Sequence, residues 1–422
     1  MNKFKLAFTS LMACLAVPVL AVVWTETEDS TASKRKVTDG NFVVGWDGTG
    51  GSAWRLYYVS HDASVGTVLD MTTLCSDMEA AEIKYPNTVN GSGFANKSGI
   101  TRIVFPEEII YFHQNAFSSM SELESVVISS KTTWSPSSNP KQCFSSCTSL
   151  SMITPRGVAE TNGVVYLPEG CTAIPNNMFQ FCNDAPIKHV IAPWVVSIKE
   201  AAFYPMSKLE TITVSPDIHT IGGNYPISDC ASLTKIIAGD NSFRKLSSLD
   251  GSQVFKNCKN FSMPLNFSKS TFTSIPYRCF WGTTDKVPEI RLPATLTYVG
   301  KNAFRMNDNI MQNLFYFYGK PPTFECDEDN IFGKHGCSSS THPRRIVFIK
   351  AEYKTEWLTM FGDKLAPITD ADKARDDYPT KSEVVKVVGA NVLGVSTYES
   401  RYCPYYVCTF VEPNMPLSII IR

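Results

Sequence analysis

Cysteine is the residue type in this 422-residue chain whose number and spacing most suggest chemistry, since thirteen are present beside six histidines. Four stand three residues after a large apolar residue in similar surroundings: Cys147, Cys182, Cys230 and Cys258. Methionine takes the matching position elsewhere, which indicates a recurrent apolar slot, and free cysteine packs as a small hydrophobe. A disulfide needs Cα atoms roughly 4.4–6.8 Å apart, closer than we expect between stacked helical turns. We therefore expect four buried, reduced thiols.

Two further cysteines bracket a polar loop. Cys326 and Cys337 flank a segment that begins Asp327-Glu328-Asp329, and the favoured interpretation is a loop disulfide, the default state in an oxidising compartment. A zinc site that adds His335 and His342 is an alternative, although these spacings match no familiar zinc finger. Calcium is a weaker alternative, because the acidic run lacks spaced carboxylates around a central glycine.

The remaining reactive residues form no recognised catalytic pattern. Cys403 and Cys408 either close a small hairpin or stay reduced. The six histidines show no cysteine-protease signature. No nucleophile elbow, phosphate-binding loop, zinc-protease motif or dinucleotide fingerprint occurs. We predict no catalytic, cofactor-binding or metal-binding residue and no enzymatic activity. Because catalytic groups assemble in space, an enzyme with its site in segment 22–60 or 380–422 stays as an alternative.

Charge and the first residues indicate an exported protein that does not bind nucleic acid. The chain has 39 basic and 40 acidic residues, so it lacks the electrostatic footprint of a protein that binds nucleic acid or an anionic membrane. Lys3 and Lys5 precede an apolar run over Leu6–Leu20, with small residues before a cleavage point after Ala21. This pattern predicts a signal peptide over residues 1–21, too short for a membrane span. A lipoprotein box at Leu11–Cys14 is the alternative. We expect a secreted or cell-surface protein without a transmembrane segment.

Internal repetition sets the expected architecture. Nine anchor positions share similar flanking residues: Phe94, Phe117, Phe144, Phe179, Phe203, Ile227, Phe255, Phe280 and Phe304. Successive anchors are 23, 27, 35, 24, 24, 28, 25 and 24 residues apart. The unit is therefore ~24 residues with occasional insertions, inside the range of leucine-rich repeats and shorter than helical-hairpin repeats.

Spacing within one unit predicts its local structure. Phe203, Met206 and Leu209 recur at intervals of three, which keeps them on one side of a tight helical turn. Ile212 and Val214 then alternate, as a short strand requires. A proline often ends that strand, where no ladder N–H is needed: Pro106, Pro168, Pro193, Pro216 and Pro293. The predicted fold is an α/β repeat solenoid, a leucine-rich-repeat stack of short parallel strands with helical turns and small β-rich end units.

The repeat resembles the BspA-type leucine-rich repeats of bacterial and protozoan surface proteins. The resemblance is carried by TYVGKNAFRMNDNI (Thr297–Ile310) and VSIKEAAFYPMSKLETITVSP (Val196–Pro216), and it covers roughly Val65 to Tyr318. It extends to RIVFIKAEYKTEW (Arg345–Trp357), which is similar to the family's closing strand and turn. The resemblance implies the architecture and, since the family contains adhesins, a role in surface recognition.

The segments outside the repeats are expected to cap the stack. We expect a signal peptide over 1–21, a β-hairpin cap over 22–64, about nine repeats over 65–320, a loop and closing repeat over 321–367, and a linker with a small β-rich segment over 368–422. The hairpin is predicted from β-prone runs on either side of a glycine-rich turn. Terminal repeats would otherwise expose the edge of the core.

Function is predicted from the surface that such a stack presents. An extended, rigid array suits binding of an extracellular protein or glycan, without a cofactor. Alternation turns one set of strand residues outward: Arg102, Val104, Val127, Thr213 and Arg291. Loop tryptophans are further candidates, although each could instead cover the core: Trp134, Trp194 and Trp281. The ligand-binding residues themselves and the ligand's identity stay undetermined. A self-associating envelope or matrix component is the alternative function.

Overall fold

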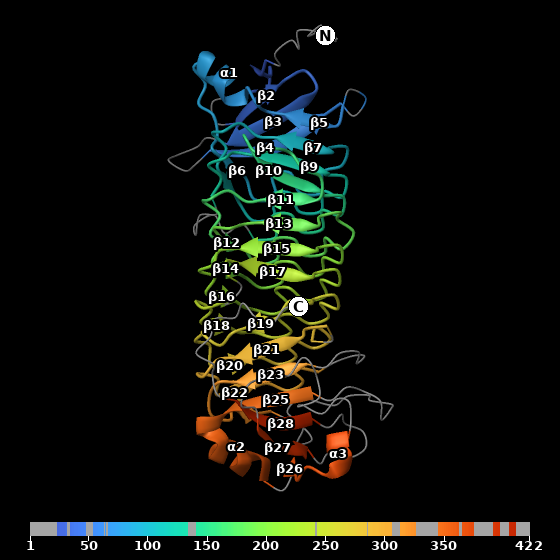
Figure 1. Cartoon of the computed structure of the whole chain (residues 1–422). Coiled ribbons are helices and arrows are strands. Elements are labelled where there is room, and N and C mark those ends of the chain that lie inside the picture. Colours follow the sequence, from blue (N-terminus) through green and yellow to red (C-terminus); the bar gives the residue numbers. More distant parts are fainter. Residues whose placement is uncertain are drawn as a thin grey trace, which may run out of the picture.

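A computed structural model shows an elongated stack of coils with its two ends capped (Figure 1). It describes residues 23–31, 34–47, 54–62, 64, 66–133, 141–240, 243–284, 286–305, 313–325, 345–362, 365–374, 391–396 and 405–410. The expected signal peptide and the alternative lipoprotein box lie outside these residues, as do Trp134, Cys403 and the whole Cys326–His342 loop with its alternative metal ligands.

The main face of the stack is built from parallel strands, one above another. Its first sheet holds eight strands: β5 (Val68–Asp70), β7 (Arg102–Val104), β9 (Ser125–Ile128), β10 (Met152–Pro155), β11 (Val164–Tyr166), β13 (His189–Ile191), β15 (Thr211–Val214) and β17 (Lys235–Ala238). Register follows the repeat, so Ile212 of β15 lies beside Ile236 of β17 and both are buried.

The same face continues as a seven-stranded sheet towards the C-terminal end: β19 (Leu265–Asn266), β21 (Glu289–Leu292), β23 (Leu314–Phe317), β25 (Arg345–Lys350), β28 (Tyr405–Phe410), β27 (Asn391–Ser396) and β26 (Leu365–Ala366). β28 pairs parallel with β25, whereas β27 and β26 complete the sheet as antiparallel strands. The C-terminal strands therefore extend the solenoid sheet itself.

A second face carries short strands that follow the proline-led loops. Four form one parallel sheet: β12 (Ala173–Ile174), β14 (Ser197–Ile198), β16 (Thr220–Ile221) and β18 (Ser248–Leu249). Three form another: β20 (Ser274–Ile275), β22 (Tyr298–Val299) and β24 (Thr323–Phe324). At the N-terminal end, a mixed sheet joins the cap to the first coils: β1 (Thr25–Glu26), β2 (Lys34–Thr38), β3 (Phe42–Asp47), β4 (Arg55–His61), β6 (Thr88–Val89) and β8 (Tyr111–Phe112).

The third side of the stack is made of turns, and the predicted helical turns and α/β character are wrong. Asn115 and Ser119, on either side of Phe117, both have left-handed backbone conformations, with φ of 58° and 60°. A local bond joins the Met120 N–H to the Phe117 carbonyl at 3.2 Å, but the Phe117 N–H donates to Cys143 of the next coil at 3.0 Å. The anchor N–H groups thus form a ladder of hydrogen bonds between coils. A helix would need the same N–H groups for its own internal hydrogen bonds. Consecutive turns also place every third residue on the inner side, so the apolar spacing of three in the sequence fits them as well as it fits a helix.

Helices are few in the described part of the chain, and none lies at an anchor turn. Their bounds are α1 (Leu74–Ala80), the 3-10 helix η1 (Ala351–Tyr353), α2 (Lys354–Phe361) and α3 (Asp370–Ala374). The architecture is a β-solenoid.

The anchor side chains form the core, as predicted. All nine are at most 2% exposed. Their rings stack coil upon coil, with Phe144 and Phe179 at 6.0 Å and 12°, and Phe280 and Phe304 at 5.6 Å and 1°. Burial of each phenylalanine contributes about 1.5–3 kcal/mol, and each aromatic pair adds about 0.5–1.5 kcal/mol.

The cysteine ladder is confirmed as free, buried thiols. Each thiol donates to the anchor carbonyl of the preceding coil; Cys182 Sγ, for example, lies 3.1 Å from the Phe144 oxygen, and Cys230 Sγ lies 3.3 Å from that of Phe203. Thr283 occupies the same repeat position and its hydroxyl donates in the same way. In the four cysteine units and at Thr283, the slot residue therefore gives the preceding anchor carbonyl a hydrogen-bond donor, whereas Met120 and Met206 fill the same slot with apolar side chains.

Candidate interaction surface

A surface loop, which we call the strap (residues 156–163), runs across the outer face of the first sheet. It joins β10 to β11, and these consecutive strands lie side by side and parallel. The parallel neighbours β11 and β13, β13 and β15, and β15 and β17 are each joined by a full coil, but this crossover returns over the outside of the sheet. Gly157, with φ of 81°, permits the turn that starts it. The 35-residue interval before Phe179 is therefore one coil with an added strand.

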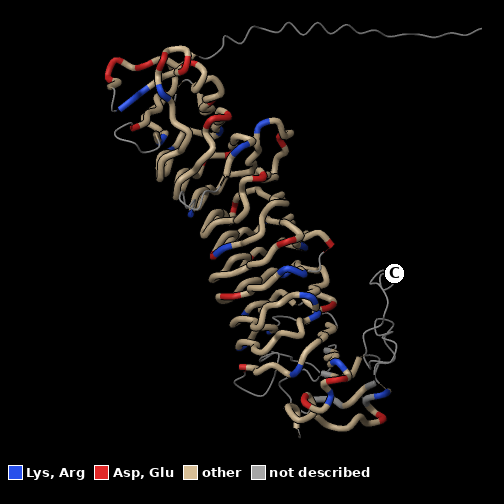
Figure 2. The backbone as a smooth tube through the Cα atoms, turned by 90° about the vertical axis from the view of Figure 1, so that its left-hand side faces the viewer, with Lys and Arg blue, Asp and Glu red and all other residues tan. Residues whose placement is uncertain are grey.

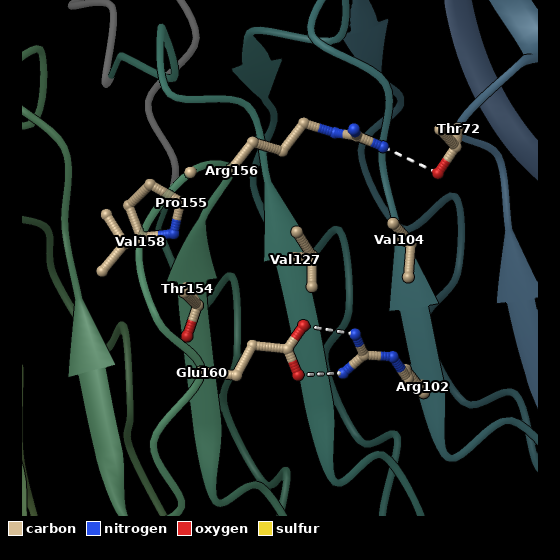
Figure 3. Close-up of a pocket in the computed structure, with 10 residues that line it drawn as sticks. Thr72, Arg102, Val104, Val127, Thr154, Pro155, Arg156, Val158 and Glu160 are labelled. Atoms are coloured by element: carbon tan, nitrogen blue, oxygen red, sulfur yellow. Dashed lines mark hydrogen bonds and ion pairs between the residues drawn. The ribbon is translucent and has the colours of Figure 1, made fainter. Parts of the chain in front are cut away.

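Two arginines fasten the strap to the sheet (Figure 3). Arg102 on β7 holds Glu160 with two N–H groups, at 3.0 and 2.6 Å. In the second contact the arginine belongs to the strap: Arg156 donates from Nε to the Phe105 carbonyl and from Nη2 to the Thr72 hydroxyl, both at 2.7 Å. Paired guanidinium–carboxylate bonds of this kind fix geometry more firmly than single ones. The strap is consequently held at its first residue and near its middle.

A pocket of about 260 Å³ lies between the strap and the sheet. Its floor includes the outward side chains Val104, Val127 and Thr154, from three neighbouring strands (Figure 3). Thr154 is 1% exposed, and its hydroxyl has no hydrogen-bond partner among the described residues. A buried polar group without a partner is costly, so a water molecule or a ligand group in the pocket would stabilise Thr154 by bonding its hydroxyl.

A second hollow of about 290 Å³ lies on the other side of the strap. Val158 of the strap and Trp194, in the loop after β13, line it with Tyr166 and Glu169. Trp194 is 46% exposed and Val158 is 42% exposed, while most large apolar side chains are buried. We call this hollow the Trp194 groove. Exposed tryptophan beside polar groups is typical of recognition surfaces.

The outward strand residues are only partly available. Thr213 is half-buried between buried Ile212 and Val214, as alternation predicts. Val104 and Val127 also point outward, but the strap covers them, leaving them 9% and 8% exposed. Arg291 is half-buried, because it pairs with Glu289 and donates to the Tyr318 hydroxyl at 2.9 Å. Acidic and basic positions are scattered along the stack without a stripe of either sign (Figure 2).

Towards the C-terminal end, the outer face is covered by a second hydrophobic cluster. Phe315, Phe317 and Val347 point into the main core, so the alternate residues on the same strands face outward. These outward residues are buried together with Ile368 and Val392 against them: Leu314, Tyr316, Tyr318, Ile346, Phe348, Tyr406, Cys408 and Phe410. These outward positions are therefore packed against one another and are not exposed surface.

Three thiols of the cysteine ladder are poorly suited to nucleophilic chemistry. Burial raises the pKa of Cys182 to about 12 and also raises the pKa of Cys147 and Cys258. The thiolate is the reactive form, so these groups are inert near neutral pH. Cys408 is a free, buried thiol.

No three His, Cys, Asp or Glu side chains in the described part of the chain could together hold a metal ion. No helix among the described residues is long and apolar enough to cross a membrane.

The strap and both hollows were not foreseen from the sequence. The long interval between anchors indicates an insertion, but the path of the inserted chain depends on distant residues. Arg102 precedes its partner Glu160 by 58 residues, and Thr72 precedes its partner Arg156 by 84. Trp194 was among the candidate tryptophans, and the structure places it on the surface. Trp281 is half-buried at an anchor turn.

Comparison with known proteins finds the BspA type leucine-rich repeat region in six copies, over residues 74–182, 161–262 and 228–318. A leucine-rich cell surface protein from Faecalibacterium prausnitzii is 17% identical, covering 69% of this chain and 89% of its own, with a TM-score of 0.33. The pneumococcal vaccine antigen PcpA is 13% identical, with 80% and 96% covered and a TM-score of 0.37. A leucine-rich repeat protein from Eubacterium ventriosum is 12% identical, with 65% and 87% covered and a TM-score of 0.30. No curated protein matches the chain.

Proposed function

The chain belongs to the BspA-type leucine-rich repeat family, and on that premise we propose that it is an exported, non-enzymatic recognition protein. It binds a protein or glycan outside the cytoplasm through the strap and the Trp194 groove. The solenoid supplies a rigid support, because its strands and anchor turns are bonded from coil to coil.

The observation that carries this proposal is the pairing of Trp194 and Val158 at the groove. Seven large apolar side chains of the described residues are exposed, and these two line the same hollow. While Trp194 and Val158 are exposed to water, the protein lacks the stabilisation that burial of these two side chains would give. A partner that covers the groove recovers that energy, and the rim carboxylate of Glu169 supplies a hydrogen-bond acceptor for orientation.

A binding screen tests the proposal. The whole chain is presented to arrays of extracellular proteins and glycans, and the strongest ligand is then titrated against Trp194→Ala. We expect at least tenfold weaker binding, since central tryptophans often contribute about 2 kcal/mol or more. The control is Phe181→Ala, because Phe181 is also an exposed aromatic, 54% accessible, but it lies on the turn side.

Equal binding by Trp194→Ala and the unaltered chain would overturn the groove as the recognition site. Retention of only further copies of this chain would instead support the self-associating structural component and refute recognition of a foreign partner.

A further inference from the structure

Three cations surround one tryptophan on the turn side of the stack, far in sequence from the strap. Arg278 Cζ lies 4.1 Å from the ring centre of Trp281, Arg305 Cζ lies 4.7 Å from it, and Lys256 Nζ lies 5.7 Å from it. Cation–π attraction holds each of them near the ring. Because all three contact the same side chain, three positive charges lie close together.

The repeat explains how these residues meet. Lys256, Trp281 and Arg305 each follow an anchor phenylalanine directly, in three consecutive coils. The three anchor rings stack at 5.3 and 5.6 Å, so the residues after them rise in register along the outside. Arg278 belongs to the same turn as Trp281, whose N–H donates to the Arg278 carbonyl at 3.3 Å.

No carboxylate of the described residues forms an ion pair with any of these three cations. Arg278 is half-buried, and its Nε–H is buried without a hydrogen-bond partner among those residues. The acid on the adjacent coil is Asp229, whose N–H donates to the Lys256 carbonyl at 2.7 Å. Its carboxylate instead accepts bonds from Ser228 at 3.0 Å and Asn257 at 2.7 Å. Within the part of the chain that the structure describes, no carboxylate therefore offsets the positive charge of the cluster.

We propose that Lys256, Arg278 and Arg305, assembled on Trp281, form a binding site for the sulfate or carboxylate groups of an acidic polysaccharide. A guanidinium presents parallel N–H donors that match an oxyanion in pairs. Contact with the indole restrains both guanidinium groups, so less freedom is lost when an anion binds. The cations repeat coil by coil, which suits a polymer with a charged group on successive sugar rings.

This site is separate from the strap, so its test is independent of the function proposed above. The probe is dextran sulfate, with neutral dextran as the matched uncharged polymer, and binding to the whole chain is measured by interferometry. The test variant is R278N/R305S. Other coils carry asparagine at the first position, as at Asn115 and Asn177, and serine at the second, as at Ser118 and Ser145. The variant should consequently fold, which its thermal unfolding midpoint checks.

We expect dextran sulfate to bind, dextran not to bind, and the variant to lose at least tenfold in affinity. The control K188Q/R244Q removes two cations that are already paired with Glu210 and Asp240, and it should change affinity less than twofold. Trp194→Ala should leave this binding unchanged. Inorganic sulfate at low millimolar concentration should not displace the polymer; displacement would show a site for the small anion and overturn the assignment to a polysaccharide.

Equal losses in the variant and the control would reduce the interaction to general surface charge and overturn the site. Absence of dextran sulfate binding would overturn it as well. Tighter binding of a charge-matched oligothymidylate would contradict the assignment to a polysaccharide.

Discussion

Substitution of an anchor phenylalanine tests the register of the whole stack. Phe203 is fully buried, and its ring stacks on Phe179 at 5.8 Å and 9°, with Ile227 at the anchor position on the other side. Phe203→Ala should lower the free energy of unfolding by about 3–5 kcal/mol, the usual range for a buried phenylalanine. Phe280 stacks on phenylalanines in both adjacent coils, so Phe280→Ala should cost about 0.5–1.5 kcal/mol more.

The assay is urea denaturation followed by far-ultraviolet circular dichroism. Phe181→Ala is the control, because this phenylalanine lies two residues after the Phe179 anchor but is 54% exposed. Its loss should stay within about 0.5 kcal/mol. The reasoning would be refuted if Phe203→Ala were no more destabilising than Phe181→Ala.

Three further predictions concern the thiol ladder and the strap. Cys230→Ala should destabilise by about 1–3 kcal/mol, because the Phe203 carbonyl loses its donor, and Cys230→Thr should lose less in the same urea titration; equal losses would exclude the donor role. The pKa of Cys182 is raised by burial to about 12, so above about pH 8.5 the folded state keeps a proton that the unfolded state releases, and stability should fall as pH rises. The stability of Cys182→Thr should therefore decline less steeply between pH 8 and 10. An unchanged slope would contradict this. Glu160→Gln should change the unfolding free energy by less than about 1 kcal/mol yet speed proteolysis within residues 156–163, whereas unchanged cleavage would show that Arg102 does not hold the strap.

The repeat could be predicted because its physical requirements are local. An anchor residue and the apolar positions around it recur within each ~24-residue unit, and stacking then buries all of them. The cysteine slot followed from the same register, although the thiol's bond to the preceding coil did not. The turn conformation was mistaken for a helix because both place every third residue inward, and only the ladder of N–H groups between coils separates them.

The candidate surface could not be predicted because it depends on contacts between distant residues. Outward strand positions were identified by alternation, but nothing near Val127 in the sequence indicates that the strap covers it. Likewise, Tyr316 and Phe348 alternate with core residues as exposed positions would, yet packing of β28 beside β25 buries them. Cations from three coils lie around the Trp281 ring, and the sequence indicates this cluster only when the anchor positions of the coils are aligned.

Hydrogen–deuterium exchange in the presence of the ligand found by the binding screen tests the central claim most directly. Ligand that occupies the Trp194 groove should slow amide exchange in the strap, residues 156–163, and in the loop around Trp194, since bound surface excludes water and suppresses local opening. Exchange in β27 and β28 should stay as it is in the free chain. Protection confined to β26, β27 and β28, with exchange in the strap unchanged, would show that the ligand binds at the C-terminal end and that the repeats only support that site. This result would contradict the account.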